Sequence, residues 1–208
     1  MSTSSKRPRV VRKHDPKQCF TAATYRQKAL PLLMEDFERR CAYSLVHVET
    51  LSDHNMEVDH HNPTIKTRKL HAYGNLYPAI SLCNNSKSGV WPKPKQMAQR
   101  LRFLDPCKEQ DYGVHLFEDP DKGCELVAVS PEGLFHWENC DLNNEWLKRK
   151  RRERNEDIEF KTAYVCVLKA DKNPENQLLL SLLQPILDRM QRNIPSIPRS
   201  LPGARIID

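Results

Sequence analysis

The chain has 208 residues, a net charge of +6 and 38% hydrophobic residues, which suits one domain with additions or a small domain plus an accessory one. No apolar run approaches the roughly 20 residues of a membrane span, and the basic N-terminal stretch lacks the apolar core of a secretory signal. Seven dispersed cysteines without a C-x-x-C pair favour a reducing compartment over a disulfide framework. We therefore expect a soluble, cytoplasmic protein with no membrane partner.

Residues 1–20 are predicted to form a flexible basic arm, because six Lys and Arg residues stand against the single acid Asp15. A solvated tail and an electrostatic tether to nucleic acid or to an acidic partner both fit this composition. From about residue 22 to residue 40, apolar residues recur at spacings of three to five. This spacing predicts a helix, with Pro31 at a kink or in a first turn.

Short apolar runs then predict a small β region. Residues 43–49 and 56–60 indicate a hairpin that turns at 52–55. After a charged loop, residues 76–82 predict another strand, which Pro78 confines to an edge. Residues 83–89 predict one or two turns of helix, in which Asn84 and Lys87 share a face.

The span from residue 60 to residue 104 contains no Asp or Glu, although the composition of the chain predicts about six in that length. It contains eight Lys and Arg residues, so the rest of the chain sums to a charge of about −2. The positive field is concentrated on the segment that holds Asp59, His60, Asn84 and Lys87. A polyanion is the natural partner of such a field.

The residue types in this segment suit phosphodiester hydrolysis. Asp59 offers a carboxylate oxygen and Asn84 an amide oxygen, a pair that suits Mg²⁺ or Mn²⁺. His60 titrates near neutrality and can take a proton from an attacking water, while Lys87 would neutralise a phosphate. Neighbouring strand residues point to opposite faces, so Asp59 and His60 can act together only if the strand bends at its end.

The same residues resemble the HNH, or His-Me finger, nuclease family. The match comprises Asp59, His60 and Pro63 as D-H-x-x-P, then Asn75 and Leu76 as N-L, then Asn84 with Lys87 three residues on. The resemblance implies a ββα-metal core within residues 21–104. It implies His60 as general base, Asp59 and Asn84 as metal ligands, and Asn75 as the residue that braces the loop.

Departures from the family pattern concern zinc. Many members hold a structural zinc with two C-x-x-C pairs, which survive here only as Cys41 with Ser44 and as Ile80 with Cys83. Two thiols cannot close a four-ligand zinc site, so we predict no structural zinc and two cysteines packed as small hydrophobes. His61 stands where the family commonly has an apolar residue. It is either an auxiliary ligand or phosphate contact, or a hydrogen-bonded structural histidine.

Residues 105–192 are predicted to form a mixed, largely helical accessory region, followed by a Pro-rich tail at 193–208. A basic helix is expected within 92–103, a hairpin of residues 114–117 and 125–129, and a strand at 133–137. A charged helix should begin after Asp141, and a leucine-rich helix interrupted by Pro185 should span 178–190. The predicted fold class is therefore α+β, an HNH core with flanking helices.

Looser similarities point to the HNH subunits of Septu-type bacterial anti-phage systems, which pair with an ATPase. They are the F-L-D-P segment and the spacing of Leu142, Asn143, Leu147 and Arg151. We expect a metal-dependent endonuclease that acts on DNA in preference to RNA and is a candidate subunit of an anti-phage complex. Its expected phosphate contacts are Lys87, Lys66, Arg68, Lys69 and Arg100. The alternatives are a catalytically silent nucleic-acid-binding adaptor and a protein whose basic span serves only protein contacts.

Overall fold

The computed structural model describes residues 7–192, so residues 1–6 and the Pro-rich tail at 193–208 lie outside the described part. The chain belongs to the α+β class, as predicted. The helices and strands are, in order, α1 (Tyr25–Asp36), β1 (Met56–His60), β2 (Leu76–Ile80), α2 (Ser81–Lys87), α3 (Pro94–Ala98), β3 (Leu116–Asp119), β4 (Glu125–Ala128), α4 (Pro131–Asn139), α5 (Glu145–Ala170) and α6 (Pro174–Arg192). Within residues 7–192, none of the helices has the length and apolar character needed to cross a bilayer.

The first sheet pairs β1 with β2 in antiparallel register, so that Val58 lies opposite Pro78 and His60 opposite Leu76. The strand at β2 and the helix after it were predicted correctly. The predicted hairpin between residues 43–49 and β1 is wrong, because the chain turns tightly there. Leu45 has a φ of +62°, and its amide donates a hydrogen bond to the carbonyl oxygen of Cys41.

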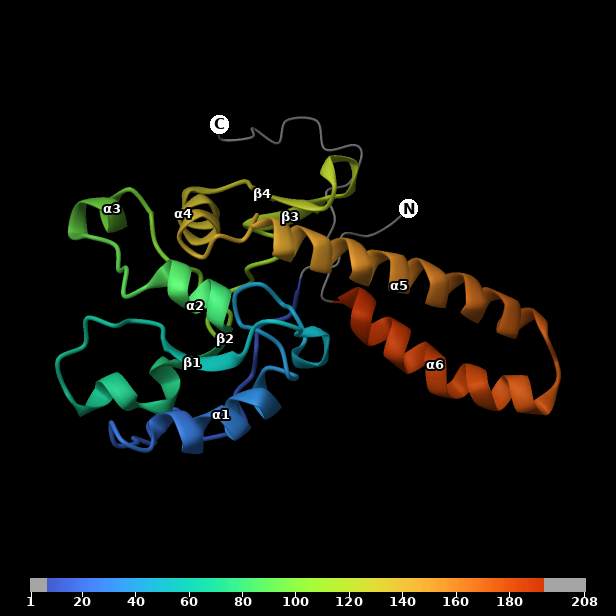
Figure 1. Cartoon of the computed structure of the whole chain (residues 1–208), viewed down its shortest axis with the longest axis horizontal. Helices are drawn as coiled ribbons and strands as arrows, with labels where there is room; N and C mark the ends of the chain where they lie inside the picture. The colour runs from blue at the N-terminus through green and yellow to red at the C-terminus, as the bar shows by residue number, and fades with distance from the viewer. Residues whose placement is uncertain (1–6, 193–208) are drawn as a thin grey trace.

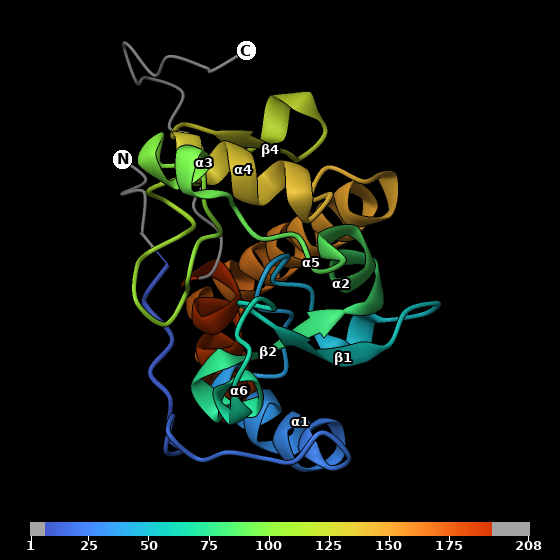
Figure 2. The ribbon, with the colours of Figure 1, turned by 90° about the vertical axis from the view of Figure 1, so that its left-hand side faces the viewer.

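Two helices enclose this sheet. Figure 2 shows β1 and β2 between α1 below and α2 above. Ala29 and Leu33 of α1 are fully buried against the strands. The same core continues to Leu116 of β3 and Leu147 of α5, so residues on both sides of position 104 share one hydrophobic interior.

The second sheet is the predicted hairpin of β3 and β4. The strand predicted at 133–137 is wrong, since these residues belong to α4. Ser130 accepts a hydrogen bond from the amide of Gly133 at 3.1 Å, and Pro131 occupies the first helical position, both of which are signals that begin a helix. The basic helix expected within 92–103 is limited to α3, because Arg100 takes a left-handed φ of +64°.

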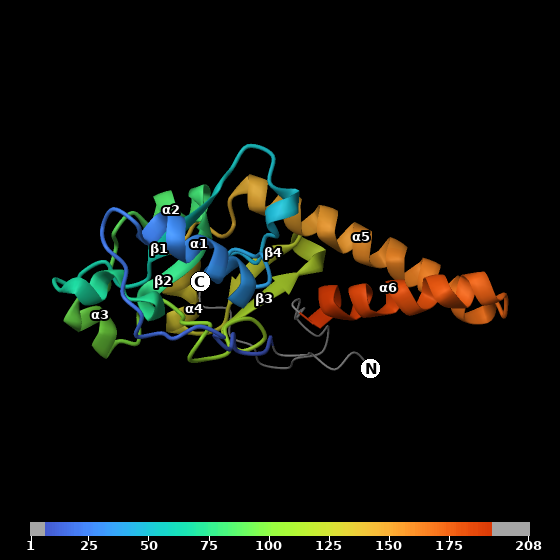
Figure 3. The same cartoon turned by 90° about the horizontal axis from the view of Figure 1, so that it is seen from below.

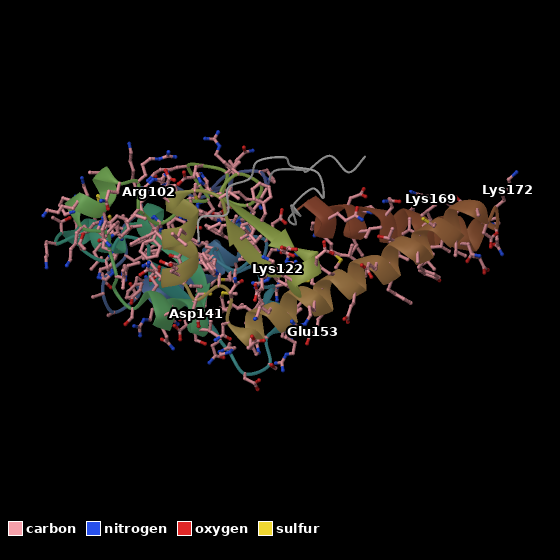
Figure 4. All side chains as sticks on the ribbon, turned by 90° about the horizontal axis from the view of Figure 1, so that it is seen from above. Arg102, Lys122, Asp141, Glu153, Lys169 and Lys172 are labelled. Atoms are coloured by element: carbon pink, nitrogen blue, oxygen red, sulfur yellow. The ribbon has the colours of Figure 1, made fainter. Side chains whose placement is uncertain are left out.

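The helices α5 and α6 form a hairpin that projects from the rest of the molecule (Figures 1 and 3). The side chain of Asn144 caps α5 by accepting a hydrogen bond from the amide of Trp146 at 3.0 Å. The buried Arg151 then ties the first half of α5 to the body through the carbonyl oxygens of Cys124 and Leu142. Lys169 and Lys172 mark the far tip of the hairpin (Figure 4).

Residues 7–20 do not extend as the predicted flexible arm but lie along the body. Arg7 is buried and forms an ion pair with Asp111 at 2.7 Å. The guanidinium of Arg12 lies 4.8 Å from the ring centre of Tyr73 and 4.7 Å from that of Tyr77. Cationic side chains thus find carboxylate and aromatic partners on the protein itself, which composition alone does not reveal.

Candidate metal and nucleic-acid site

The carboxylate and the amide that the sequence singles out both lie where α2 packs against β1. Side chains alternate along a strand, so Glu57 and Asp59 face the same side, and Asn84 and Lys87 share a face of α2. Side chains on this face of α2 form pairs with side chains on this side of β1. Asn84 Nδ2 donates to Glu57 Oε2 at 2.6 Å, and Lys87 Nζ lies 3.0 Å from Asp59 Oδ2. Asp59 and Asn84 therefore lie at the same contact between α2 and β1, each bonded to a different neighbour.

Asp59 and Lys87 form a buried ion pair. The Lys87 side chain is fully buried and Asp59 is 7% exposed. Lys87 Nζ also donates to the carbonyl oxygen of His60 at 2.8 Å, and the Tyr43 hydroxyl donates to Asp59 Oδ2. Burial raises the pKa of Asp59, while the charge of Lys87 and the Tyr43 hydrogen bond offset part of that rise. Lys87 is therefore an internal counter-ion in this structure, not the exposed phosphate contact that we predicted, because α2 packs this face on β1.

His60 lies on the opposite side of β1 from Asp59. The strand stays regular as far as the His60–Leu76 pair, and the chain bends directly after it at residues 61–62, where we expected a bend. The His60 ring lies 4.8 Å from that of Tyr25, and its Nε2 is 3.0 Å from Nδ1 of His71. Burial, which has the largest effect, and the electrostatic influence of His71, Lys87 and Arg26 lower the pKa of His60 to about 4. The ring is therefore neutral at pH 7 and able to accept a proton.

Asn75 fastens the loop between β1 and β2. Its Nδ2 donates to the carbonyl oxygens of Asn62 at 3.1 Å and Leu70 at 2.9 Å, and its Oδ1 accepts from the amide of Asn62 at 2.9 Å. The amide of His61 donates to the Asn75 carbonyl oxygen at 2.9 Å. One side chain thereby joins the beginning of the loop to its end.

Cys41, Ser44, Ile80 and Cys83, the four positions that we compared with zinc-binding pairs, converge in the core. The amides of Ser44 and Ile80 lie 3.4 and 3.5 Å from Cys41 Sγ, and the thiol of Cys83 hydrogen bonds to Cys41. Both cysteines are free and fully buried. Burial acts to raise the pKa of Cys41, but the hydrogen bonds with Cys83, Ser44 and Ile80 outweigh it and lower the pKa to about 6.

His61 packs among aromatic rings, with centroids 4.8 Å from Tyr77 and 5.6 Å from Trp91. Its Nδ1 is buried and has no hydrogen-bond partner in the described part of the chain, so the hydrogen bond expected for a structural histidine does not form at this nitrogen. Burial lowers the pKa of His61 to about 4. The ring faces a cavity of about 700 Å³ that Trp91 and Arg102 also line.

The other predicted phosphate contacts differ in their availability. Lys66, Arg68 and Lys69 are exposed, and the last two belong to the 3₁₀ turn Arg68–His71, which also places His71 beside His60. Arg100 forms an ion pair with Glu132 at 2.7 Å. An exposed cationic cluster of Lys66, Arg68 and Lys69 therefore adjoins the histidine pair.

The donor set at this contact between α2 and β1 suits a hard divalent cation. Carboxylate oxygens of Glu57 and Asp59 and the amide oxygen of Asn84 are ligands that Mg²⁺ and Mn²⁺ accept. Asn84 uses its nitrogen, not its oxygen, to bond Glu57. Across residues 7–192, no three His, Cys, Asp or Glu side chains gather as a metal-binding group, so substrate and water would complete the shell. An ion bound to Asp59 would compete with Lys87 for the carboxylate.

Three residues that the structure adds to the site were not predicted from the sequence. Glu57 could have been included from strand alternation alone, because it lies two residues before Asp59. Tyr43 and His71 carry no such local signal: they reach Asp59 and His60 only through the turn at Leu45 and the loop that Asn75 closes. Tertiary structure therefore adds the hydrogen-bond partners of both central residues.

No family model, curated protein or solved structure matches the chain.

Proposed function

We propose that the chain is a metal-dependent endonuclease of the HNH type that hydrolyses DNA phosphodiester bonds, with β1, β2 and α2 as its ββα-metal core. One observation carries the proposal: a single strand–loop–strand–helix unit positions Asp59, His60 and Asn84, and Asn75 fastens its loop. Motif spacing alone does not require Asn75 to make these bonds. The convergence of Cys41 and Cys83 with positions 44 and 80 gives independent support.

In this proposal His60 acts as the general base. Its pKa of about 4 keeps the ring neutral at pH 7, and the contact between Nε2 and His71 orients it. In the tautomer in which His60 Nε2 donates to His71 Nδ1, the free Nδ1 of His60 takes a proton from water attacking phosphorus. The exposed cluster of Lys66, Arg68 and Lys69 attracts the DNA backbone.

Asp59 and Asn84 would hold the divalent ion, with Glu57 as the adjoining carboxylate. Bound there, Mg²⁺ or Mn²⁺ would stabilise charge on the phosphoryl and leaving oxygens. Lys87 holds Asp59 at 3.0 Å, so metal affinity depends on how readily this lysine yields the carboxylate.

Plasmid nicking across metals tests the proposal. Cleavage should require Mg²⁺ or Mn²⁺ and should disappear in His60→Ala while DNA binding persists. His14→Ala is the matched control, since this histidine is also partly exposed and bonds Glu35 instead of the site. Cleavage that is unchanged in His60→Ala, or that proceeds in EDTA, contradicts the assignment.

A catalytically silent nucleic-acid-binding adaptor is the second candidate. The buried Lys87–Asp59 pair favours it, because the carboxylate of the D-H pair is already neutralised inside the protein. An adaptor would bind DNA with an affinity that falls steeply with salt, yet would cleave nothing with any metal.

We further propose a cytoplasmic setting and an ATPase partner, as in Septu-type defence. The hairpin of α5 and α6 leaves large apolar side chains uncovered, with Phe160 72% and Leu178 65% exposed. Such a surface is typical of a binding face. Co-expression with ATPases encoded beside this chain, followed by size-exclusion chromatography, tests whether one of them co-elutes.

A further inference from the structure

A cavity of about 450 Å³ lies where the α5–α6 hairpin meets residues 40–50. It shares no lining residue with the site around Asp59 and His60. Glu153, which lines it, stands toward the body end of the hairpin in Figure 4. We call this cavity the Arg40 cavity. Five of its lining residues are permanently cationic: Arg40, Lys150, Arg151, Arg154 and Arg189.

Arg40 and Arg151 have no ion pair among the described residues, but Arg151 is fully hydrogen-bonded to Cys124, Leu142 and Asn143, whereas Arg40 is not. Arg40 Nη1 donates to the carbonyl oxygen of Leu45 at 3.1 Å, but its Nε is buried without a hydrogen-bond partner. Among the described residues no carboxylate lies within 4.0 Å of its guanidinium. Burial and repulsion by Arg154, Arg7 and Arg189 lower the pKa of Arg40, although Glu38 acts in the opposite direction.

The acids that line the cavity do not pair with Arg40, because other cations hold them. Glu49 lies 3.7 Å from Arg39, Glu153 lies 2.8 Å from Lys150, and Asp157 pairs with Lys161. Arg154 is itself bonded to Glu118 through the neighbouring strand β3. A buried charge without a counter-ion is costly, and an anion in the cavity would remove that cost.

We propose that the Arg40 cavity binds an organic phosphate of nucleotide size, with its phosphate group against Arg40. An arginine guanidinium can bind two phosphate oxygens at once. A doubly charged phosphate also neutralises more of the positive charge of the cavity lining than a carboxylate does. Val46, Ile186 and Met190 give the cavity an apolar part of its lining, which suits a base or another flat organic group. The volume is that of a small-molecule site and is much larger than inorganic phosphate requires.

Calorimetry in a phosphate-free buffer tests the proposal with three probes: AMP, inorganic phosphate and adenosine. AMP should bind the full-length protein, inorganic phosphate more weakly, and adenosine not measurably. Arg40→Gln should weaken AMP binding about tenfold or more, since it removes a charged hydrogen-bond donor. Arg152→Gln is the control, because Arg152 is exposed on α5 and does not line the cavity.

Thermal unfolding separates a ligand-binding role from a structural one. Without ligand, Arg40→Gln should be at least as stable as the wild type, because it removes a half-buried charge that has no ion pair among the described residues. With AMP present, the wild type should gain stability and Arg40→Gln should not. His60→Ala should bind AMP normally, so failure of the nuclease proposal would leave this result intact. Absence of AMP binding by the wild type, equal binding of AMP and inorganic phosphate, or unchanged affinity in Arg40→Gln would overturn the proposal.

Discussion

Replacing Lys87 by Met tests the buried ion pair at the centre of the candidate site. Methionine keeps most of the apolar volume of lysine but removes the ammonium. The substitution deletes the contacts of Lys87 Nζ with Asp59 at 3.0 Å and with the carbonyl oxygen of His60 at 2.8 Å. Asp59 would remain buried, with the Tyr43 hydroxyl and the backbone amide of His60 as hydrogen-bond donors.

The expected loss follows from these contacts. Removing one partner of a buried ion pair costs about 3–5 kcal/mol, because the other charge stays desolvated. The lost hydrogen bond to the His60 carbonyl adds about 1 kcal/mol, and the retained Tyr43 bond offsets a similar amount. We therefore expect the free energy of unfolding to fall by about 3–5 kcal/mol at pH 7, a large share of the about 5–15 kcal/mol typical of folded proteins.

Urea unfolding followed by tryptophan fluorescence, in EDTA, measures this loss, and Asp59→Asn with Lys87→Met closes a double-mutant cycle. The double variant should recover about 2 kcal/mol relative to Lys87→Met, because the uncompensated carboxylate is gone. The Asp59 pKa is already raised by burial and rises further without Lys87. Protonation then relieves the buried charge, so the penalty of Lys87→Met should shrink as pH falls toward that pKa. A penalty under about 0.5 kcal/mol, or strict additivity in the cycle, would refute the reasoning.

Further predictions concern acid stability, the loop and the N-terminal segment. The unfolded chain takes up histidine protons near pH 6.5, whereas buried His61 and His136 have pKa values of about 4 and about 3. Each should therefore cost about 1.4 kcal/mol of unfolding free energy per pH unit as pH falls from 6.5 toward 4, and urea titrations that show no such slope would contradict the burial. Asn75→Ala should cost about 2 kcal/mol and speed amide exchange across residues 61–75, because it frees both ends of the loop; exchange confined to residue 75 would argue against the bracing role. Arg12→Ala should lower the unfolding free energy by about 1–2 kcal/mol through lost cation–π contacts with Tyr73 and Tyr77, whereas the exposed Arg9→Ala should change it by less than about 0.5 kcal/mol.

The elements that the sequence predicts correctly have local signals. The caps, apolar periods and turn residues of β2, α2, the β3–β4 hairpin and the last two helices lie within the elements or beside them. The failures at 43–49 and 133–137 are short apolar runs, for which the strand and helix periods are hard to separate. At 133–137 the preceding Ser130 caps a helix and Pro131 occupies its first position. At 43–49 the positive φ of Leu45 is incompatible with an extended strand.

In the candidate site, too, the features with a local sequence signal could be predicted and the long-range contacts could not. Motif spacing anticipates that β1, the loop and α2 carry Asp59, Asn75 and Asn84, because the spacing fixes positions within one supersecondary unit. It does not anticipate the pairing of Asp59 with Lys87 or of His60 with His71. Those contacts depend on how α2 and the loop pack on β1, which adjacent residues in the sequence do not encode.

The N-terminal segment also constrains how the chain is synthesised. Arg7 bonds Asp111, 104 residues later, and the Val10 amide bonds the carbonyl oxygen of Pro106. The ribosome therefore synthesises this segment long before its partners. The buried ion pair between Arg7 and Asp111 cannot form until residue 111 has left the exit tunnel. Folding during translation must accordingly finish late, with residues 7–10 docking only after residues 106–111 have been synthesised.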